Sequence, residues 1–291
     1  MSAIPSRPTE IPDAGKPPRL SMRTKFAYGL GDWGTSAATA ARNLYWLFFL
    51  VSVVGLNAEL AGIIILIGRV WDSINDPLVG TLSDGLQSRW GRRRPLIVAG
   101  AIPFGVTFFL LFYVPAWDSD LALLIYYAVV YLLFDTVYTI VNVPYAAMLP
   151  ELTEDYDERS SLAGWRIAIA ILASVVAVAT FKSTAENLIG VRLAASMGLV
   201  EAVRFGYAVT AAIWSVTLIL SPLLLVLLVK ETGSKGRAVR DPFHPIQTLR
   251  EVLRNRPFRL VAVIYMLGFT TADVVVTVFV WFLIFYVRVQ K

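Results

Sequence analysis

Long apolar segments separated by polar loops are the feature of this 291-residue sequence that most restricts its fold. A helix needs about 20 mostly apolar residues to cross a bilayer. Seven segments meet that requirement: 26–54, 59–82, 96–115, 121–149, 161–181, 205–229 and 260–287. A mean hydropathy of +0.64 and a hydrophobic fraction of 57% agree with this placement. The sequence therefore predicts an all-α, multi-pass integral membrane protein.

The distribution of basic residues predicts the orientation in the membrane. The loop "SRWGRRRP" and the loop before the seventh segment are rich in lysine and arginine, whereas the first and third loops contain neither. Cytosolic loops of membrane proteins carry the excess of these residues, so the N-terminus is expected inside the cell. The net charge of +5 then reflects membrane topology, and a nucleic-acid partner is not expected.

The order of the segments predicts four parts of the chain. Residues 1–25 form a cytosolic tail, since they are rich in proline and charge and lack the apolar core of a signal peptide. Residues 26–229 form a six-helix domain, 230–259 a cytosolic basic loop with a short amphipathic helix, and 260–291 a seventh transmembrane helix. A seven-helix receptor or rhodopsin is not favoured, because the N-terminus is predicted inside and the seventh segment has no internal lysine.

Composition disfavours enzyme chemistry. The absence of cysteine excludes disulfides and cysteine-based metal sites, and the single histidine, His244, lies in a polar loop. The sequence shows no nucleophile–base pair and no cluster of metal ligands. An enzyme is therefore not expected, and neither is any cofactor apart from a coupling ion.

The stretch "GRVWDSINDPLVG", from Gly68 to Gly80, places charges within the apolar second segment. A charged side chain costs at least about 2.5 kcal/mol at the centre of a bilayer, so it has to face a cavity, a partner or an ion. Arg69, Asp72 and Asp76 fall on one helical face by their spacing. Two buried carboxylates one turn apart repel when both are ionised. We therefore expect this pair to take up H⁺ or Na⁺, and oxygen ligands suit such a hard cation.

Polar residues recur at helical spacing in other segments and predict a cavity between helices. The first segment carries Asp32, Ser36, Thr39 and Asn43, with Arg42 beside them; the fourth carries Asp135, Tyr138, Thr139 and Asn142; the fifth carries Arg166, followed on its face by Ala170, Ala173 and Ala177. The alanines would permit close helix packing. The alternative for Asp32, Arg42 and Asp135 is that they lie at membrane ends or form structural ion pairs.

Four stretches occur in this order along the chain: "KFAYGLGDWG", "RVWDSINDPLVG", "GTLSDGLQSRWGRRRP" and "YTIVNVPYAAMLPELTEDYDERSSLAGWR". Together they resemble the glycoside–pentoside–hexuronide:cation symporter family, the melibiose-carrier-like branch of the major facilitator superfamily, over about residues 23–290. The resemblance implies the N-terminal six-helix bundle of such a carrier plus the first helix of its C-terminal half. A twelve-span carrier is longer, so we expect the chain to be incomplete and to need the missing C-terminal half or a second chain.

The resemblance also implies a function and a set of residues. It implies a cation-coupled sugar carrier in the inner membrane that works by alternating access. The family's Na⁺ site falls on Asp72, Asn75, Asp76 and Thr139. The superfamily's cytosolic gating motif falls on Gly80, Asp84, Gly91 and Arg92. With the polar stripes, the expected substrate-binding residues are Asp32, Ser36, Tyr138, Asn142 and Arg166.

Alternatives remain for the substrate and for the function itself. Ser36 and Asn142 replace the family's two sugar-binding acids and bind hydroxyl groups more weakly, so a galactoside is disfavoured. Ala146 replaces its stacking tryptophan. An anionic sugar such as a glucuronide could use Arg166 and Arg42. A lysolipid is another candidate, since related animal carriers use the same "WD…DP" helix for Na⁺-driven lysolipid uptake. A non-transporting half-carrier with a structural or regulatory role is the last alternative.

Overall fold

The computed structural model describes residues 19–86, 88–229 and 254–285, which are helical and contain no strand. The helices are α1 (Met22–Phe48), α2 (Ala58–Gly85), α3 (Arg94–Leu111), α4 (Asp120–Leu152), α5 (Tyr156–Ser183), α6 (Val191–Met197), α7 (Leu199–Leu228) and α9 (Arg256–Phe285). Two π-helical stretches, η1 (Phe49–Val54) and η2 (Thr184–Gly190), continue α1 and α5. The predicted all-α fold is confirmed within the described residues.

Five helical stretches are long and apolar enough to cross a membrane: Met22–Val54, Arg94–Leu111, Asp120–Leu152, Tyr156–Met197 and Leu199–Leu228. They coincide with five of the seven predicted segments, and α2 and α9 occupy the other two. The chain is therefore a multi-pass membrane protein, while the number of seven spans stays a prediction. The amphipathic helix expected within 230–259 and most of the tail 1–25 lie outside the described residues.

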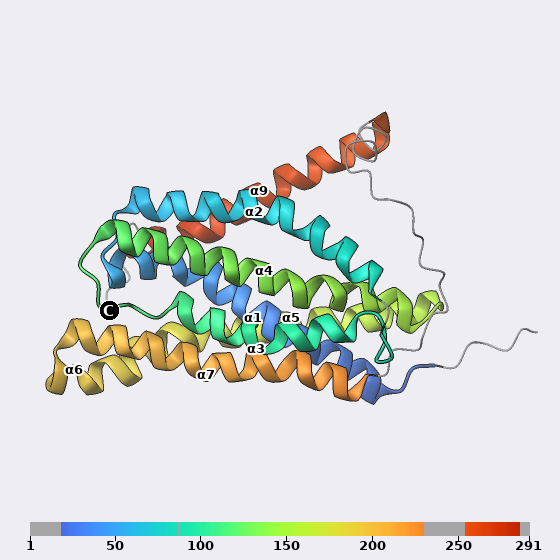
Figure 1. Cartoon of the computed structure of the whole chain (residues 1–291), viewed down its shortest axis with the longest axis horizontal. Coiled ribbons are helices and arrows are strands. Elements are labelled where there is room, and N and C mark those ends of the chain that lie inside the picture. Colours follow the sequence, from blue (N-terminus) through green and yellow to red (C-terminus); the bar gives the residue numbers. More distant parts are fainter. Residues whose placement is uncertain (1–18, 87, 230–253, 286–291) are drawn as a thin grey trace, which may run out of the picture.

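α1 lies at the centre of the bundle (Figure 1). It packs along α5 and α7, while α3 packs against both α4 and α7. Ala37 on α1 and Ala173 and Ala177 on α5 form a fully buried cluster, as expected of small residues at a close helix contact. α2 packs along α4 at the edge of the bundle, and α9 contacts α1.

α2 has two different faces. Five of its exposed apolar residues follow one another every four positions: Leu66, Val70, Ile74, Leu78 and Leu82. Its buried residues include Gly68, Asn75, Val79 and Ser83, on the side where α2 packs against α4. Helical spacing places Asp72 and Asp76 beside the buried stripe and away from the exposed one. The charges of α2 therefore lie next to its contact with α4.

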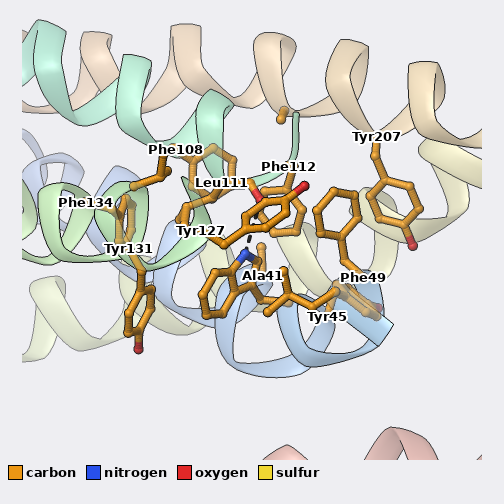
Figure 2. Close-up of a cluster of buried hydrophobic side chains, with 14 of the residues drawn as sticks. Ala41, Tyr45, Phe49, Phe108, Leu111, Phe112, Tyr127, Tyr131, Phe134 and Tyr207 are labelled. Carbon is orange, nitrogen blue, oxygen red and sulfur yellow. Dashed lines mark hydrogen bonds between the residues drawn. The ribbon is translucent and has the colours of Figure 1, made fainter. Parts of the chain in front are cut away.

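Aromatic side chains pack the end of the bundle at which α1 continues into η1 (Figure 2). Ring centroids of Phe112, Tyr127 and Tyr207 lie 5.3, 6.3 and 5.1 Å from that of Phe49. Trp46 Nε1 donates a hydrogen bond of 3.1 Å to the carbonyl oxygen of Leu111. We call this the aromatic end, and the predicted orientation makes it the outer end. Such rings bury a large apolar area, so α1, α3, α4 and α7 are held together there.

We predict that Gly68→Ala destabilises the contact between α2 and α4. A Cβ at Gly68 would lie 1.7 Å from Cε1 of Tyr131, whose ring is stacked on Trp46 at 4.5 Å. Overpacking of this kind lowers the free energy of unfolding by about 1–3 kcal/mol. The matched change Gly62→Ala lies in the same helix, and its Cβ would meet no atom within 4 Å. It should leave stability unchanged or raised, and equal melting temperatures for the two variants in detergent would contradict the prediction.

Candidate functional site

A cavity of about 300 Å³ lies between α1, α4 and α5, and we call it the polar pocket. Its lining consists of Asp32, Ser36, Thr39, Ala40, Tyr138, Asn142, Arg166 and Ser174. All five residues expected to bind substrate therefore lie around one cavity, although they come from three helices. Thr39 belongs to the stripe predicted in the first segment. Ser174 gives no signal in the sequence, because a lone serine in an apolar segment has no polar periodicity.

An ion pair between α1 and α5 forms one wall of the polar pocket. Arg166 Nε donates to Asp32 Oδ2 at 2.7 Å, and the Asp32 side chain is buried. The other Asp32 oxygen accepts hydrogen bonds from Thr35 Oγ1 at 2.6 Å and Ser36 Oγ at 3.2 Å. The Arg166 guanidinium also lies 4.8 Å from the centre of the Tyr145 ring. The pairing alternative for Asp32 therefore holds, and the pair lines the pocket as well.

The four residues expected to bind the coupling ion lie at the contact between α2 and α4. Thr139 Oγ1 donates to Asp76 Oδ1 at 2.9 Å. Asn75 Nδ2 instead donates to the backbone oxygen of Asp135 at 3.3 Å, so its amide nitrogen is directed at α4. Asp72 lies one helical turn before Asp76, on the same side of α2. Within the described part of the chain no group of three or more acidic or histidine side chains could hold a metal. A cation there would use two carboxylates with hydroxyl and amide oxygens.

A buried ion pair joins α1 to α4 one turn beyond the polar pocket, towards the aromatic end. Arg42 Nη1 lies 2.5 Å from Asp135 Oδ1, and their side chains are 10% and 1% exposed. The guanidinium carbon lies 5.4 Å from the ring centre of Tyr131 and 5.7 Å from that of Phe134. The sequence analysis gives an ion pair as one alternative for Arg42 and for Asp135, but it does not indicate that these two residues pair with each other. That depends on how α1 and α4 are rotated.

Arginines ahead of α3 connect helix ends on the side predicted to be cytosolic. Arg93 Nη1 lies 2.6 Å from Asp84 Oδ1 and donates to Ser83 Oγ at 2.7 Å. Arg92 Nη2 and Arg93 Nη2 lie 2.5 and 3.2 Å from Glu151 Oε1 at the end of α4. We expected Asp84 and Arg92 to supply the charged contacts of a gate. In the structure Arg93 contacts Asp84 and Arg92 contacts Glu151, so Arg93 and Glu151 take part in contacts that sequence reasoning missed.

The two glycines of the expected gate behave differently. Gly91 has φ +105°, a left-handed conformation that favours glycine, and it turns the chain just before the arginines. At Gly80 a Cβ would meet no atom within 4 Å among the described residues. Gly80 is therefore not a point of close helix approach in this arrangement.

The chain is similar to proteins named as symporters and transporters. "Uncharacterized symporter sll1374" of Synechocystis is 40% identical over 175 residues, which are 58% of this chain and 32% of the relative. The isoprimeverose transporter of Lactiplantibacillus pentosus is 32% identical over 152 residues, 52% of this chain and 32% of the relative. The sodium-dependent lysophosphatidylcholine symporter 1 of Xenopus tropicalis is 27% identical over 262 residues, 82% of this chain and 50% of the relative. The aligned stretches thus span between a third and a half of these relatives.

The match to a protein family covers more of this chain than the alignments with the two bacterial relatives do. Residues 27–291 match the family described as "MFS/sugar transport protein". That range includes the polar pocket, the α2 carboxylates and the arginines ahead of α3. It confirms the resemblance to a symporter branch of the major facilitator superfamily. This multi-pass membrane chain therefore belongs to the MFS/sugar transport protein family.

Proposed function

We propose that this chain carries out cation-coupled symport of a sugar or glycoside by alternating access, with Na⁺ or H⁺ as the coupling ion. The observation that carries the proposal is the polar pocket, in which polar groups of α1, α4 and α5 converge on one cavity. On α4, pocket residue Tyr138 is next in sequence to Thr139, which contacts α2. Relatives named as symporters, and one named as an isoprimeverose transporter, support the proposal.

The polar pocket suits an uncharged ligand that is rich in hydroxyl groups. It offers carboxylate, guanidinium, amide and hydroxyl groups, which together supply several donors and acceptors. Asp32 and Arg166 neutralise each other, so a neutral ligand leaves no buried charge without a partner. Thr35 and Ser36 already hold the carboxylate in place, which reduces the ordering required on binding. The same charge balance makes a glucuronide a poorer fit.

The α2 carboxylates are the proposed coupling site. A cation beside Asp72 and Asp76 would offset the repulsion between the two carboxylates. Thr139 binds Asp76, and its neighbour Tyr138 lines the polar pocket. Ion and sugar would therefore both act on the same turn of α4. Binding of one then favours binding of the other, and the coupling is reciprocal.

The contacts of Arg92 and Arg93 are the proposed inner gate. They connect the end of α2 to the end of α4 through Asp84 and Glu151. The Asp84 side chain is 65% exposed, and exposed ion pairs contribute about 0–1 kcal/mol each. A gate of this kind closes the pocket from the cytosol, and its opening has to separate Arg93 from Glu151, whose side chains are 7% and 14% exposed.

A lysolipid is the second candidate substrate, and a second cavity favours it. A space of about 790 Å³ lies beside η1, α5 and α7, with Phe48, Val53, Leu199 and Val200 among its apolar lining and Lys182 among its polar lining. Glu186, 3.9 Å from Lys182, also lines this space, and apolar walls beside two opposite charges suit an amphiphile. The relative named as a lysophosphatidylcholine symporter aligns with 82% of this chain.

We predict that Na⁺ raises the melting temperature of the purified chain and that Asp72→Asn removes this effect. A ligand present at 100 times its Kd stabilises the folded state by about 2.7 kcal/mol. The measurement is thermal unfolding in detergent while NaCl replaces choline chloride at constant ionic strength. If H⁺ is the coupling ion, the wild type and Asp72→Asn should instead differ in how the melting temperature depends on pH.

The exposed loop residue Asp118 provides the matched control. Asp118→Asn makes the same change of charge and should keep the wild-type response. The proposed coupling site would be ruled out if the melting temperature of the wild type changed with neither Na⁺ nor pH. It would also be ruled out if Asp72→Asn responded like the wild type.

We predict that Asn142→Ala weakens sugar binding about 2–10-fold, since a neutral hydrogen bond is worth about 0.5–1.5 kcal/mol. Asn43→Ala removes the same group from α1 outside the pocket lining and should have no effect. The measurement is uptake into proteoliposomes of radiolabelled glycosides and of a lysophosphatidylcholine. Uptake of the lysophosphatidylcholine alone, unchanged by Asn142→Ala, would replace the sugar proposal with the second candidate.

A further inference from the structure

The ion pair of Arg42 and Asp135 is buried without an evident gain in stability. The two residues are 9% and 1% exposed and lie deep between α1 and α4. The free-energy cost of removing two charges from water offsets most of the attraction between them. Apolar residues of similar shape therefore stabilise a fold equally well or better. The attraction between the two side chains therefore does not by itself explain why charges occupy these positions.

Both members of the pair have unused binding capacity. Arg42 Nε and Asp135 Oδ2 are buried and have no hydrogen-bond partner among the described residues. The contact between them uses the other carboxylate oxygen, Oδ1. Buried polar atoms are nearly always satisfied in folded proteins. A carboxylate oxygen in this condition attracts a further cation or hydrogen-bond donor.

The pair belongs to a larger group of charges that we call the charged cluster: Arg42, Arg69, Asp72, Asp76 and Asp135. Asn75, which lies between Asp72 and Asp76 on α2, donates to the backbone oxygen of Asp135 at 3.3 Å, and Asp76 accepts from Thr139 one turn further along α4. Three carboxylates and two guanidinium groups leave one net negative charge when all are ionised. The cluster is distinct from the neutral pair of Asp32 and Arg166 in the polar pocket.

We propose that the Arg42 guanidinium is a resident counter-ion that limits the charged cluster to a single monovalent coupling ion. With Arg42 in place, one cation at the α2 carboxylates makes the cluster neutral. Without it, two negative charges remain, and both oxygens of Asp135 become available to a second cation beside Asp72. The inference rests on the proposed function and deepens it, because it assigns the number of ions that accompany each substrate.

The test is the number of Na⁺ ions bound per chain, measured by equilibrium dialysis of the purified protein against radioactive sodium. Arg42→Gln should bind one Na⁺ more than the wild type. The double variant Arg42→Gln with Asp135→Asn restores the net charge and should return to the wild-type number, as should Arg42→Lys. Equal numbers in the wild type and Arg42→Gln, or an extra ion that persists in the double variant, would overturn the proposal.

The design separates this proposal from the proposed function. A wild type that binds no Na⁺ would count against sodium coupling, yet Arg42→Gln would still be expected to gain one ion. If Arg42→Gln does not fold, Asp135→Asn takes its place. It leaves the cluster neutral and should bind one Na⁺ fewer than the wild type, so that retention of the wild-type number overturns the proposal.

Discussion

Charged side chains inside an apolar bundle require partners, and this requirement organises the centre of the protein. Asp32 with Arg166 joins α1 to α5, and Arg42 with Asp135 joins α1 to α4. Removing one partner of such a buried pair costs about 3–5 kcal/mol, because the other charge is left uncompensated. The same contacts line the polar pocket or lie beside the α2 carboxylates. Helix packing and the candidate binding chemistry therefore depend on one set of interactions.

The two ends of the bundle are closed by different kinds of contact. Aromatic rings around Phe49 interlock at the aromatic end, where many dispersion contacts are made at once. At the opposite end Arg93 and Glu151 connect helix ends through charged hydrogen bonds. The end predicted to face the cytosol therefore depends on charged contacts, and the aromatic end on apolar packing.

The sequence predicts the helices well because the length of an apolar segment is a local property. The pocket residues other than Ala40 and Ser174 are also found from sequence, since polar periodicity and the family resemblance point to these positions. Pairings of side chains between helices, in contrast, cannot be found from the sequence. Arg42 with Asp135, and Arg93 with Glu151, depend on how two helices are rotated and where they end. The surroundings of Gly80 depend on the same rotation, and a Cβ there would meet no atom within 4 Å among the described residues.

The two faces of α2 restrict how this helix can move. Its exposed stripe, from Leu66 to Leu82, is apolar, while Asn75 and the two carboxylates lie on or beside the face that meets α4. A rotation of half a turn about the helix axis would expose those charges to lipid and bury the leucines against polar groups. Sliding or tilting keeps each face in its own surroundings. A rearrangement that keeps each face in its surroundings therefore moves α2 without turning it about its own axis.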